Sequence, residues 1–342
     1  MKIAIDVREA CKPSRAGKGQ WTYGFVSELL TRDLDLVFLS DAPLPDEWGS
    51  PSIILPSGWK WHIKALKYVK DNGIDLYVSP TSYIIPALLS SIPSVMIVHD
   101  MIAFRSEPHD KKATIIERLT LKRALSRATH VCTVSKSTAL DIHNRYHDLV
   151  RPTVIYAGPM HEHAKQNSSD DRTIACIGTV CPRKNQHRLV QAYNALPDEL
   201  RSKYVLKIVG NKGWHCSRTL DLIENSEGVS WSGYVSDKEY DSLLSSCAVL
   251  ALPSLYEGFG MQILDGLQRG IPILTSDRGS LCEVVGDIAV LSEPMSVESI
   301  TNGLTSILTN DNLRSRLAAA GPEQAERFSW KRTVDAFLAT IS

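Results

Sequence analysis

Short runs rich in β-branched residues alternate with longer helical patterns along almost the whole chain of 342 residues. The alternation begins with a strand-like run at 2–7 and reaches a similar run at 153–158. It restarts at 173–179, after a polar stretch at 161–172 that lacks apolar periodicity. Strand–helix alternation of this kind is typical of parallel sheets covered by helices on both faces. We therefore expect an α/β protein with two Rossmann-like doubly wound domains.

The length of the chain agrees with two domains, because one domain usually takes about 100–200 residues. We place the first domain at 1–162, the second at 173–322 and a C-terminal helical segment at 323–342. Lysine and arginine total 38, as do aspartate and glutamate, so the formal net charge is zero. A dedicated nucleic-acid binder normally carries a clear basic excess. We therefore expect no nucleic-acid partner.

The N-terminal run MKIAIDV has no basic region and no cleavage site, and it resembles a first buried strand more than a secretion signal. No run of about 18 apolar residues occurs that would predict a membrane span. The seven cysteines are scattered and form no C-x-x-C pair, which favours free, reduced thiols. These features predict a cytoplasmic location.

The stretch at 253–276 carries the strongest functional signal in the sequence. A strand-like run ends in Pro-Ser and is followed by Glu257 and by Gly258-Phe259-Gly260 at the start of a helix. Glycines there let a phosphate approach unpaired backbone N–H groups, and the helix dipole favours its charge. Glu257 and Asp265, two helical turns apart, could hold the sugar and the ribose of one extended ligand. The alternative is a helix whose N-terminal glutamate is simply favoured by the dipole.

This block resembles the signature of family 4 retaining glycosyltransferases of the GT-B fold, an EGFG start with a second acidic residue after seven positions. The family usually has glutamate at the second place, whereas this chain has the shorter Asp265. The resemblance implies that Asp265 contacts the donor ribose and that Glu257 orients the sugar hydroxyls. It places the donor along Glu257, Gly258, Phe259, Gly260 and Met261, with main-chain amides near the last two on the diphosphate.

The segment IGTVCPRKNQHRLVQAY resembles the family's strand followed by an Arg-Lys-Asn turn. By that resemblance Arg183 and Lys184 hold the donor diphosphate. The chemistry agrees, because the leaving diphosphate gains charge as the glycosidic bond breaks and fixed cations stabilise it. A solvated basic turn is the alternative. The resemblance also places backbone near Tyr234 and Val235 beside the nucleobase.

Two segments of the first half add to the resemblance. VHDMIAF resembles the family's His-Asp strand end, which implies that His99 lies beside the donor sugar and the reacting centre. A lone histidine at a strand end is otherwise more often structural. SRAGKGQWTYGF resembles the family's glycine loop, with Gly17 and Gly19 matching and Lys18 in place of the common isoleucine. By that resemblance Gly17 and Gly19 contact the donor.

No metal or other cofactor is expected. Asp33-Leu34-Asp35 fits the Asp-x-Asp metal motif of the other major glycosyltransferase fold, but it precedes a strand where that motif would follow one. We interpret it as a solvated turn. No histidine, cysteine and glutamate cluster has the spacing of a zinc site. Cations and helix dipoles can stabilise a diphosphate without a metal.

Two basic stretches, 59–70 and 111–127, contain few acidic residues. A basic helix with aromatic or apolar flanks can rest on anionic lipid, although an ordinary solvated face is the alternative. Both stretches lie in the domain expected to receive the acceptor. They favour a lipid-linked acceptor and peripheral contact with the inner face of the plasma membrane.

The resemblance implies a retaining glycosyltransferase that moves a hexose from a sugar nucleotide to a hydroxyl of a growing surface glycan or lipid-linked saccharide. It also implies two facing domains and a C-terminal helix that crosses back to the first one. The Arg-Lys-Asn turn and the His-Asp strand end look most like the mannosyltransferase branch, so GDP-mannose is the first donor expected and a UDP-hexose the second. A sugar-nucleotide 2-epimerase and a non-catalytic nucleotide-binding partner subunit are the alternatives.

Overall fold

The computed structural model describes residues 1–15, 17–49, 52–106, 111–161 and 172–342. Most of the polar stretch predicted as a linker, 162–171, lies outside these residues. The contacts divide the chain into two compact units, each described here by itself. Unit 1 comprises Met1–Arg105, Lys111–Met160 and Ser329–Ser342, and unit 2 consists chiefly of His161–Phe328. The helix at the C-terminus therefore belongs to the same unit as the N-terminus.

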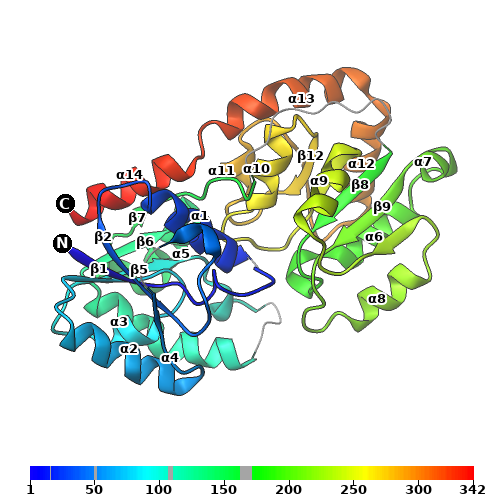
Figure 1. The fold of residues 1–342 in the computed structure, drawn as a ribbon. Helices are drawn as coiled ribbons and strands as arrows, with labels where there is room; N and C mark the ends of the chain where they lie inside the picture. The colour runs from blue at the N-terminus through cyan, green and yellow to red at the C-terminus, as the bar shows by residue number, and fades with distance from the viewer. Residues whose placement is uncertain (16, 50–51, 107–110, 162–171) are drawn as a thin grey trace. The chain divides into compact units, whose positions relative to one another are not determined.

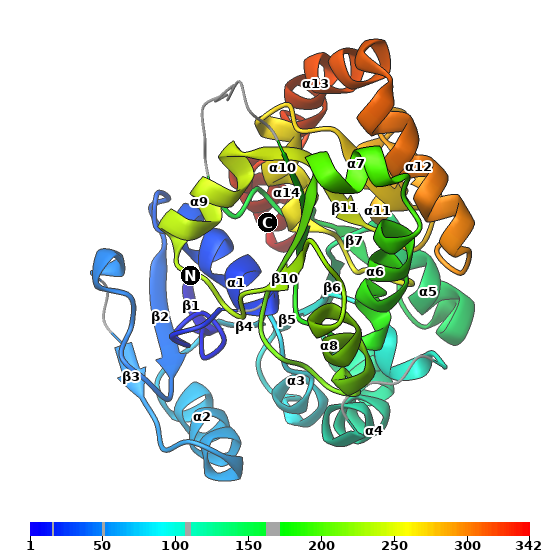
Figure 2. The same cartoon turned by 90° about the vertical axis from the view of Figure 1, so that its right-hand side faces the viewer.

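Unit 1 contains, in its described residues, a parallel sheet of seven strands in the order β3-β2-β1-β4-β5-β6-β7. The labels in Figure 2 follow this order from the edge strand β3 inward. The strands are β1 (Lys2–Asp6), β2 (Asp35–Ser40), β3 (Ser52–Ile54), β4 (Leu76–Ser79), β5 (Ser94–Val98), β6 (His130–Thr133) and β7 (Thr153–Val154). The helices are α1 (Gly17–Leu29), α2 (Trp59–Asp71), α3 (Ile84–Leu88), α4 (Lys111–Arg127), α5 (Lys136–Tyr146) and α14 (Trp330–Ile341), with single 3-10 turns η1 (Asp46–Trp48), η2 (Ile102–Phe104) and η3 (His147–Leu149).

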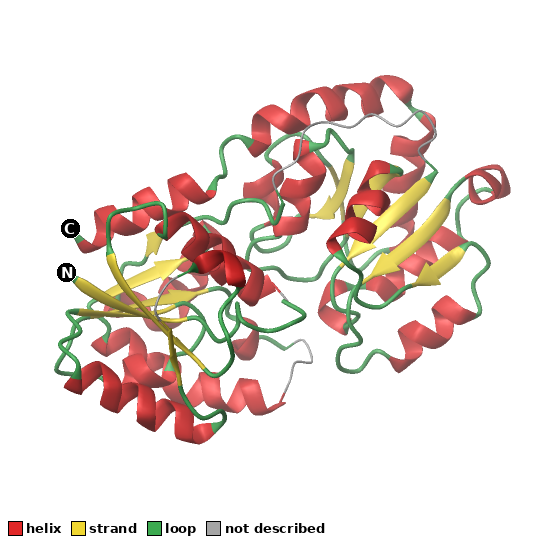
Figure 3. Cartoon of the chain, viewed as in Figure 1, coloured by secondary structure: helices red, strands yellow, loops and turns green. Residues whose placement is uncertain are grey.

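Helices cover both faces of this sheet, with α1 and α14 on one face and α2, α3 and α4 on the other (Figures 1 and 3). The central strands are largely apolar because both faces are buried, and all five residues of β5 are buried. Under α2, the side chains of Trp61, Ala65 and Val69 recur at helical spacing and pack against the sheet. Burial of this stripe, rather than helix propensity, stabilises α2.

The C-terminal helix α14 packs on α1, as the resemblance predicts. The indole N–H of Trp330 donates to the carbonyl of Pro159 at 2.8 Å, and the ring of Phe337 meets that of Phe25 edge to face. Gly24 of α1 leaves room for Trp330, because a Cβ at that position would overlap the indole. These contacts anchor the end of the chain in unit 1.

Unit 2 contains, in its described part, a parallel sheet of six strands in the order β10-β9-β8-β11-β12-β13, flanked by helices (Figure 3). The strands are β8 (Thr173–Ile177), β9 (Val205–Val209), β10 (Val229–Trp231), β11 (Cys247–Leu252), β12 (Ile273–Ser276) and β13 (Val290–Ser292). The helices are η4 (Pro182–Lys184), α6 (Gln186–Asn194), α7 (Asp198–Lys203), α8 (Ser217–Glu224), α9 (Asp237–Ser245), α10 (Met261–Gln268), α11 (Leu281–Val285), α12 (Val297–Thr309) and α13 (Asp311–Ala325). The order of both sheets is that of doubly wound α/β domains.

The structure contains one helix that passes through a proline and three short elements that were not predicted. Helix α13 continues through Pro322 to Ala325, past the boundary predicted between 322 and 323. A proline removes one helical hydrogen bond, but Leu317, Gly321 and Ala325 bury this face of the helix and hold it in place. The short elements β3, α3 and α7 were not predicted, since three to six residues carry too little periodicity.

No described helix has both the length and the apolar character that crossing a membrane requires.

Candidate functional site

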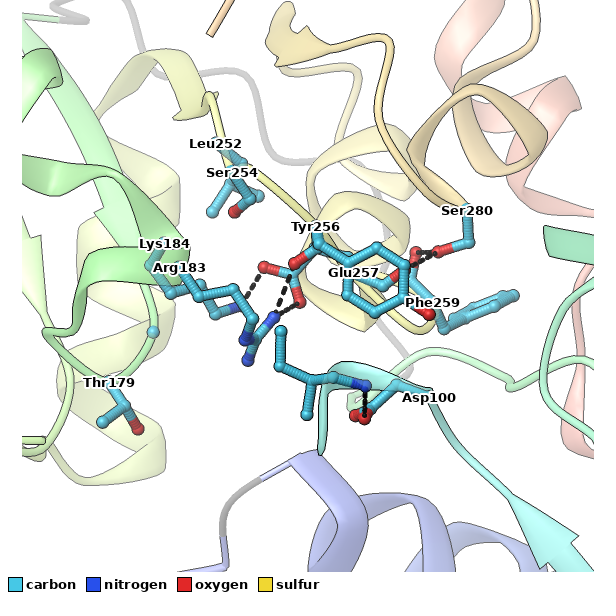
Figure 4. A network of polar contacts seen from close by, with 12 residues as sticks. Asp100, Thr179, Arg183, Lys184, Leu252, Ser254, Tyr256, Glu257, Phe259 and Ser280 are labelled. Carbon is cyan, nitrogen blue, oxygen red and sulfur yellow. Dashed lines mark hydrogen bonds and ion pairs between the residues drawn. The ribbon is translucent and has the colours of Figure 1, made fainter. Parts of the chain in front are cut away.

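Two neighbouring strands of unit 2 deliver the charged centre of the site. Arg183 and Lys184 form the turn η4 after β8, and Glu257 follows β11, which pairs with β8. The carboxyl ends of adjacent parallel strands lie at one edge of the sheet, where ligands of this fold class bind. Nη1 of Arg183 donates to Oε2 of Glu257 at 2.6 Å, and Nζ of Lys184 lies 2.7 Å from Oε1 (Figure 4). The structure therefore brings these three predicted side chains together.

The carboxylate and the lysine of this cluster are almost fully enclosed, and Arg183 is partly buried. Glu257 is 7% exposed and Lys184 is 8% exposed. Burial by itself would raise the pKa of Glu257, but the charges of Arg183 and Lys184 lower this pKa to about 2. The carboxylate is thus ionised near neutral pH, and the cluster carries one net positive charge. Such a cluster attracts a dianionic diphosphate without first having to gain or lose a proton.

The Arg-Lys turn is held by the residue that follows it. Asn185 has a left-handed backbone with φ of 60°, and its side-chain amide donates to the carbonyls of Pro253 at 2.9 Å and Pro294 at 2.7 Å. These bonds tie η4 to the loops after β11 and β13. In the sequence this asparagine is recognisable only as part of the Arg-Lys-Asn turn, and no role was predicted for it.

Gln186 and Gly178 form a second support for the turn. The amide of Gln186 donates to the carbonyls of Gly178 and Thr179, at 3.3 and 3.1 Å. Gly178 adopts φ of 143°, and a Cβ there would lie 3.0 Å from Cε of Lys184. A glycine after β8 thus lets the lysine side chain lie flat across the backbone toward Glu257. In the sequence, this feature is indicated only by a glycine near the end of the strand-like run at 173–179.

The EGFG segment is shaped by a neighbouring turn. The hydroxyl of Ser280 donates to the carbonyls of Glu257 at 3.1 Å and Phe259 at 2.9 Å (Figure 4). Gly279 has φ of 61°, and a Cβ there would lie 2.6 Å from the carbonyl oxygen of Glu257. Gly260 caps α10 with φ of 103°. Ser280 and Gly279 were not predicted as site residues, since they lie some way along the chain from the motif.

Main chain and side chains of the EGFG segment differ in exposure. Gly258 and Gly260 are partly exposed, whereas Phe259 and Met261 are buried. The ring of Phe259 meets that of Phe328 at 5.7 Å between centroids. The aromatic side chain therefore anchors the loop in the core, while its backbone stays within reach of a ligand.

Asp265, the predicted ribose contact, has no exposed surface in this structure. The hydroxyl of Tyr240 on α9 donates to Oδ2 of Asp265 at 2.8 Å. Burial is the main reason that the pKa of Tyr240 is raised well above its usual value, and the neighbouring carboxylate acts in the same direction. The ribose contact stays a prediction.

Tyr234 and Val235, predicted beside the nucleobase, lie in the loop between β10 and α9. The side chain of Tyr234 is 49% exposed, and Val235 is half-buried. The N–H of Gly210 donates to the carbonyl of Gly233 at 2.7 Å, which holds this loop at the end of β9. The loop is thus positioned at the same carboxyl edge of the sheet as the charged cluster, and its aromatic ring is available.

In unit 1, His99 directly follows β5 and is 7% exposed. Its Nε2 lies 2.7 Å from the carbonyl oxygen of Pro80, so this nitrogen carries the proton and Nδ1 is left as an acceptor. Burial lowers the pKa of His99 to about 4, and the charge of Lys18 acts in the same direction. Near neutral pH the ring is therefore neutral and able to accept a hydrogen bond from a hydroxyl.

The glycine loop of unit 1 lies near His99. The ring of Trp21 meets the imidazole edge to face at 5.2 Å, and Nζ of Lys18 lies 3.2 Å from Oε1 of Glu117. Gly17 begins α1 and has open space around it, whereas a Cβ at Gly19 would overlap the carbonyl of Glu9. Close packing accounts for Gly19, and the donor contact predicted for both glycines stays a prediction.

The Asp-x-Asp motif lies apart from these residues. Asp33 and Asp35 are both exposed, just before and at the start of β2, as expected for a solvated turn. Within the described ranges, no group of three or more histidine, cysteine, aspartate or glutamate side chains is arranged to hold a metal ion.

Solved structures of glycosyltransferases share this fold. HepE of Anabaena, crystallised with UDP and glucose, superposes with a TM-score of 0.81 over 100% of this chain and 99% of that one, at 18% identity. WaaG, a glycosyltransferase involved in lipopolysaccharide biosynthesis, gives a TM-score of 0.78 at 16% identity, covering 99% of this chain and 100% of that one. The fold is therefore the GT-B fold of glycosyltransferases.

Two family models match consecutive parts of the sequence. Residues 28–159 match "Glycosyltransferase Family 4", and residues 160–324 match "Glycosyl transferases group 1". The chain belongs to glycosyltransferase family 4, as the EGFG block predicts.

Similar curated proteins include bacterial mannosyltransferases. The chain is 37% identical over 168 residues to the O-antigen chain mannosyltransferase B of Escherichia coli, a match that covers 47% of this chain and 44% of that protein. It is 31% identical over 172 residues to the serotype-specific mannosyltransferase WbdA of the same species, covering 48% and 21%. It is 26% identical over 247 residues to the O-antigen chain mannosyltransferase RfbU of Salmonella typhimurium, covering 71% and 68%. The matches thus span less than half the length of the first two relatives.

Proposed function

We propose that this chain is a retaining mannosyltransferase that moves mannose from GDP-mannose to a hydroxyl of a growing surface glycan or lipid-linked saccharide. The observation that carries the proposal is the enclosed cluster of Arg183, Lys184 and Glu257 at the carboxyl edge of the unit 2 sheet. Family membership and the names of the mannosyltransferase relatives support the reaction and the donor.

The two cations bind the donor diphosphate. Arg183 and Lys184 are held on one carboxylate in the structure, so they are already oriented before a ligand arrives. Arrival of two phosphate charges draws the cations partly away from Glu257, whose oxygens then accept hydrogen bonds from the sugar hydroxyls. Main-chain amides near Gly260 and Met261, at the start of α10, are further donors to the diphosphate.

The reaction breaks the bond between the anomeric carbon and the diphosphate oxygen and forms a bond to the acceptor oxygen on the same face. The acceptor proton passes to the leaving phosphate, so no protein nucleophile is needed. Negative charge grows on the diphosphate as its bond breaks, and prepositioned cations stabilise that charge most strongly in the transition state. The neutral imidazole of His99 accepts a hydrogen bond from a sugar hydroxyl through Nδ1.

A donor screen followed by a transfer assay tests the proposal. The melting temperature is measured with GDP-mannose, UDP-glucose, UDP-galactose and ADP-glucose, and we expect a marked rise with GDP-mannose alone. Mannose transfer is then measured with a mannose-terminated oligosaccharide, and the configuration of the new bond is read by NMR. If the protein converts the free donor to its 2-epimer without an acceptor, it is an epimerase and not a transferase. Nucleotide binding without any turnover would favour the non-catalytic partner.

We further propose that the enzyme works in the cytoplasm on the inner face of the plasma membrane, without a metal ion. The basic helices α2 and α4 of unit 1 support a peripheral location. We expect a chelator to leave the activity unchanged. We also expect the enzyme to stay on membranes washed at low salt and to be released from them at high salt.

A further inference from the structure

A pocket of about 590 Å³ lies in unit 1, outside the residues assigned above. The turn η2 contributes Phe104, helix α4 contributes Lys122, and helix α5 contributes Asn144, Arg145 and Tyr146. None of these residues belongs to the donor site described above, although Phe104 and Tyr146 also pack against the hydrophobic core.

The lining is rich in positive charge. Arg105, Lys122 and Arg145 face a single carboxylate, that of Asp141, which lies 4.0 Å from Arg105. Within the described residues, Lys122 and Arg145 form no ion pair or hydrogen bond with another side chain or carbonyl. Two cations of the pocket are thus available to an anion.

Arg145 is oriented for such an anion. Its guanidinium lies over the ring of Phe104, 4.3 Å from the centroid, and 5.8 Å from that of Tyr146. Stacking on an aromatic ring fixes the plane of the guanidinium and leaves its N–H groups at the edges free to donate. The planar fork of an arginine matches the oxygens of a phosphate group.

An apolar stripe runs along α4 toward this pocket. Ile115 and Leu119 are 58% and 76% exposed, and Lys122 follows them at helical spacing on the same face. Large exposed apolar side chains beside a cationic pocket match a molecule with an apolar tail and an anionic head. The exposed lysines at the start of α4, Lys111 and Lys112, add attraction to an anionic surface.

We propose that the pocket lined by Phe104, Lys122, Asn144 and Arg145 holds the phosphate of a phospholipid head group, with Ile115 and Leu119 entering the apolar layer. Lys122 connects the two parts, because it lies on the apolar face of α4 and also lines the pocket. The proposal rests on the peripheral membrane location proposed above and names the site that holds the lipid, but its test needs no sugar transfer.

Vesicle binding tests the proposal on the whole chain. Cosedimentation is measured with vesicles of phosphatidylcholine alone and of phosphatidylcholine with phosphatidylglycerol. The double variant Lys122→Ala/Arg145→Ala should bind the anionic vesicles about 25-fold more weakly, since each cation near an anionic surface contributes about fivefold. Leu119→Ser should weaken the same binding while leaving every pocket residue in place.

The matched control is Lys64→Ala/Lys67→Ala on α2, which removes the same charge from exposed positions outside the pocket. We expect this control to lose less vesicle binding than the pocket variant, because these lysines supply only general attraction to an anionic surface and no head-group site. Equal losses of vesicle binding in the two variants would show that only the total charge matters and would overturn the assignment of a head-group site to the pocket. The circular dichroism spectrum and melting temperature of each variant are also measured. Both should be unchanged, which shows that weaker binding does not result from unfolding.

A soluble probe separates the lipid from free phosphate. Calorimetry with glycerol 3-phosphate should detect weak binding that Lys122→Ala/Arg145→Ala abolishes and Leu119→Ser preserves. Binding of the soluble probe with no binding of anionic vesicles would overturn the lipid assignment. Transfer to a soluble acceptor should be unchanged in the pocket variant, so a failed lipid assignment and a failed transferase assignment are told apart.

Discussion

The hydroxyl of Tyr240 donates a 2.8 Å hydrogen bond to Oδ2 of Asp265, which has no surface exposed to solvent. Asp265 occupies the second acidic position of the EGFG block, where the family usually has the longer glutamate. The shorter side chain is thus bonded to a neighbouring helix in this structure. A ribose contact requires that this carboxylate share its oxygens with both the tyrosine and the nucleotide.

We predict that Asp265 discriminates ribose from deoxyribose. The protein should bind GDP about 10- to 150-fold more tightly than 2′-deoxy-GDP, since one hydrogen bond to a charged group contributes about 1.5–3 kcal/mol. Asp265→Asn should lose most of this preference, as measured by calorimetry with both nucleotides. Tyr240→Phe is the control, because it keeps the carboxylate and should keep the preference. An Asp265→Asn variant with unchanged discrimination would show that the ribose lies elsewhere.

Glu257→Gln should abolish turnover but spare nucleotide binding. The amide keeps the size of the side chain and removes the negative charge that the sugar hydroxyls require, so kcat should fall about 10²–10³-fold. The affinity for GDP should be equal or higher, because Arg183 and Lys184 no longer have a competing carboxylate. Glu293→Gln, at an exposed ion pair with Arg278, is the control and should leave both quantities unchanged. Substantial turnover in Glu257→Gln would refute the role assigned to this residue.

Protonation of His99 should destabilise the folded chain in mild acid. The folded pKa is lowered to about 4 from the usual 6.5, so the stability that depends on the neutral ring is complete above pH 6.5. That stability is lost as the pH falls from 6.5 toward 4, by up to about 1.4 kcal/mol per pH unit. Urea unfolding at several pH values should give a flatter profile for His99→Gln. Glu257 also has a lowered pKa, but its contribution is lost only below about 4.5, in a separate range. Parallel profiles for the two proteins would contradict the prediction.

Asn185 should be required for the shape of the Arg-Lys turn. Asn185→Gly removes the two bonds to the carbonyls of Pro253 and Pro294, together with the bond accepted from Arg188, and should lower the free energy of unfolding by about 1–3 kcal/mol. Asn185→Ala should cost about 1 kcal/mol more, because alanine is disfavoured at φ of 60°. Both variants should also bind GDP more weakly, as calorimetry would detect. Variants with wild-type stability would mean that these bonds contribute nothing net.

Gly24→Ala should displace the C-terminal helix from α1. A methyl group at this position overlaps the indole of Trp330, and such overpacking typically costs about 1–3 kcal/mol. Gly17→Ala, at the open start of the same helix, should change the free energy of unfolding by no more than about 0.5 kcal/mol. Denaturant unfolding followed by tryptophan fluorescence compares the two variants. Similar stabilities would show that α14 moves aside at little cost.

The sequence by itself determined the fold class, the order of most strands and helices and the presence of the charged motif. Each of these rests on local information: β-branched runs, helical spacing, and the letters of the PRKN and EGFG segments. The short element α3 and the passage of α13 through Pro322 were beyond such reasoning, because tertiary burial stabilises them against weak or contrary local preference.

Only the tertiary structure decided which side chains meet. Arg183 and Glu257 follow separate strands far apart in the chain, and the pairing of β8 with β11 brings their side chains to 2.6 Å. Likewise, the bond between Tyr240 and Asp265 depends on where α9 packs. A motif specifies which chemical groups are present, but their contacts, burial and pKa values arise from packing between distant segments.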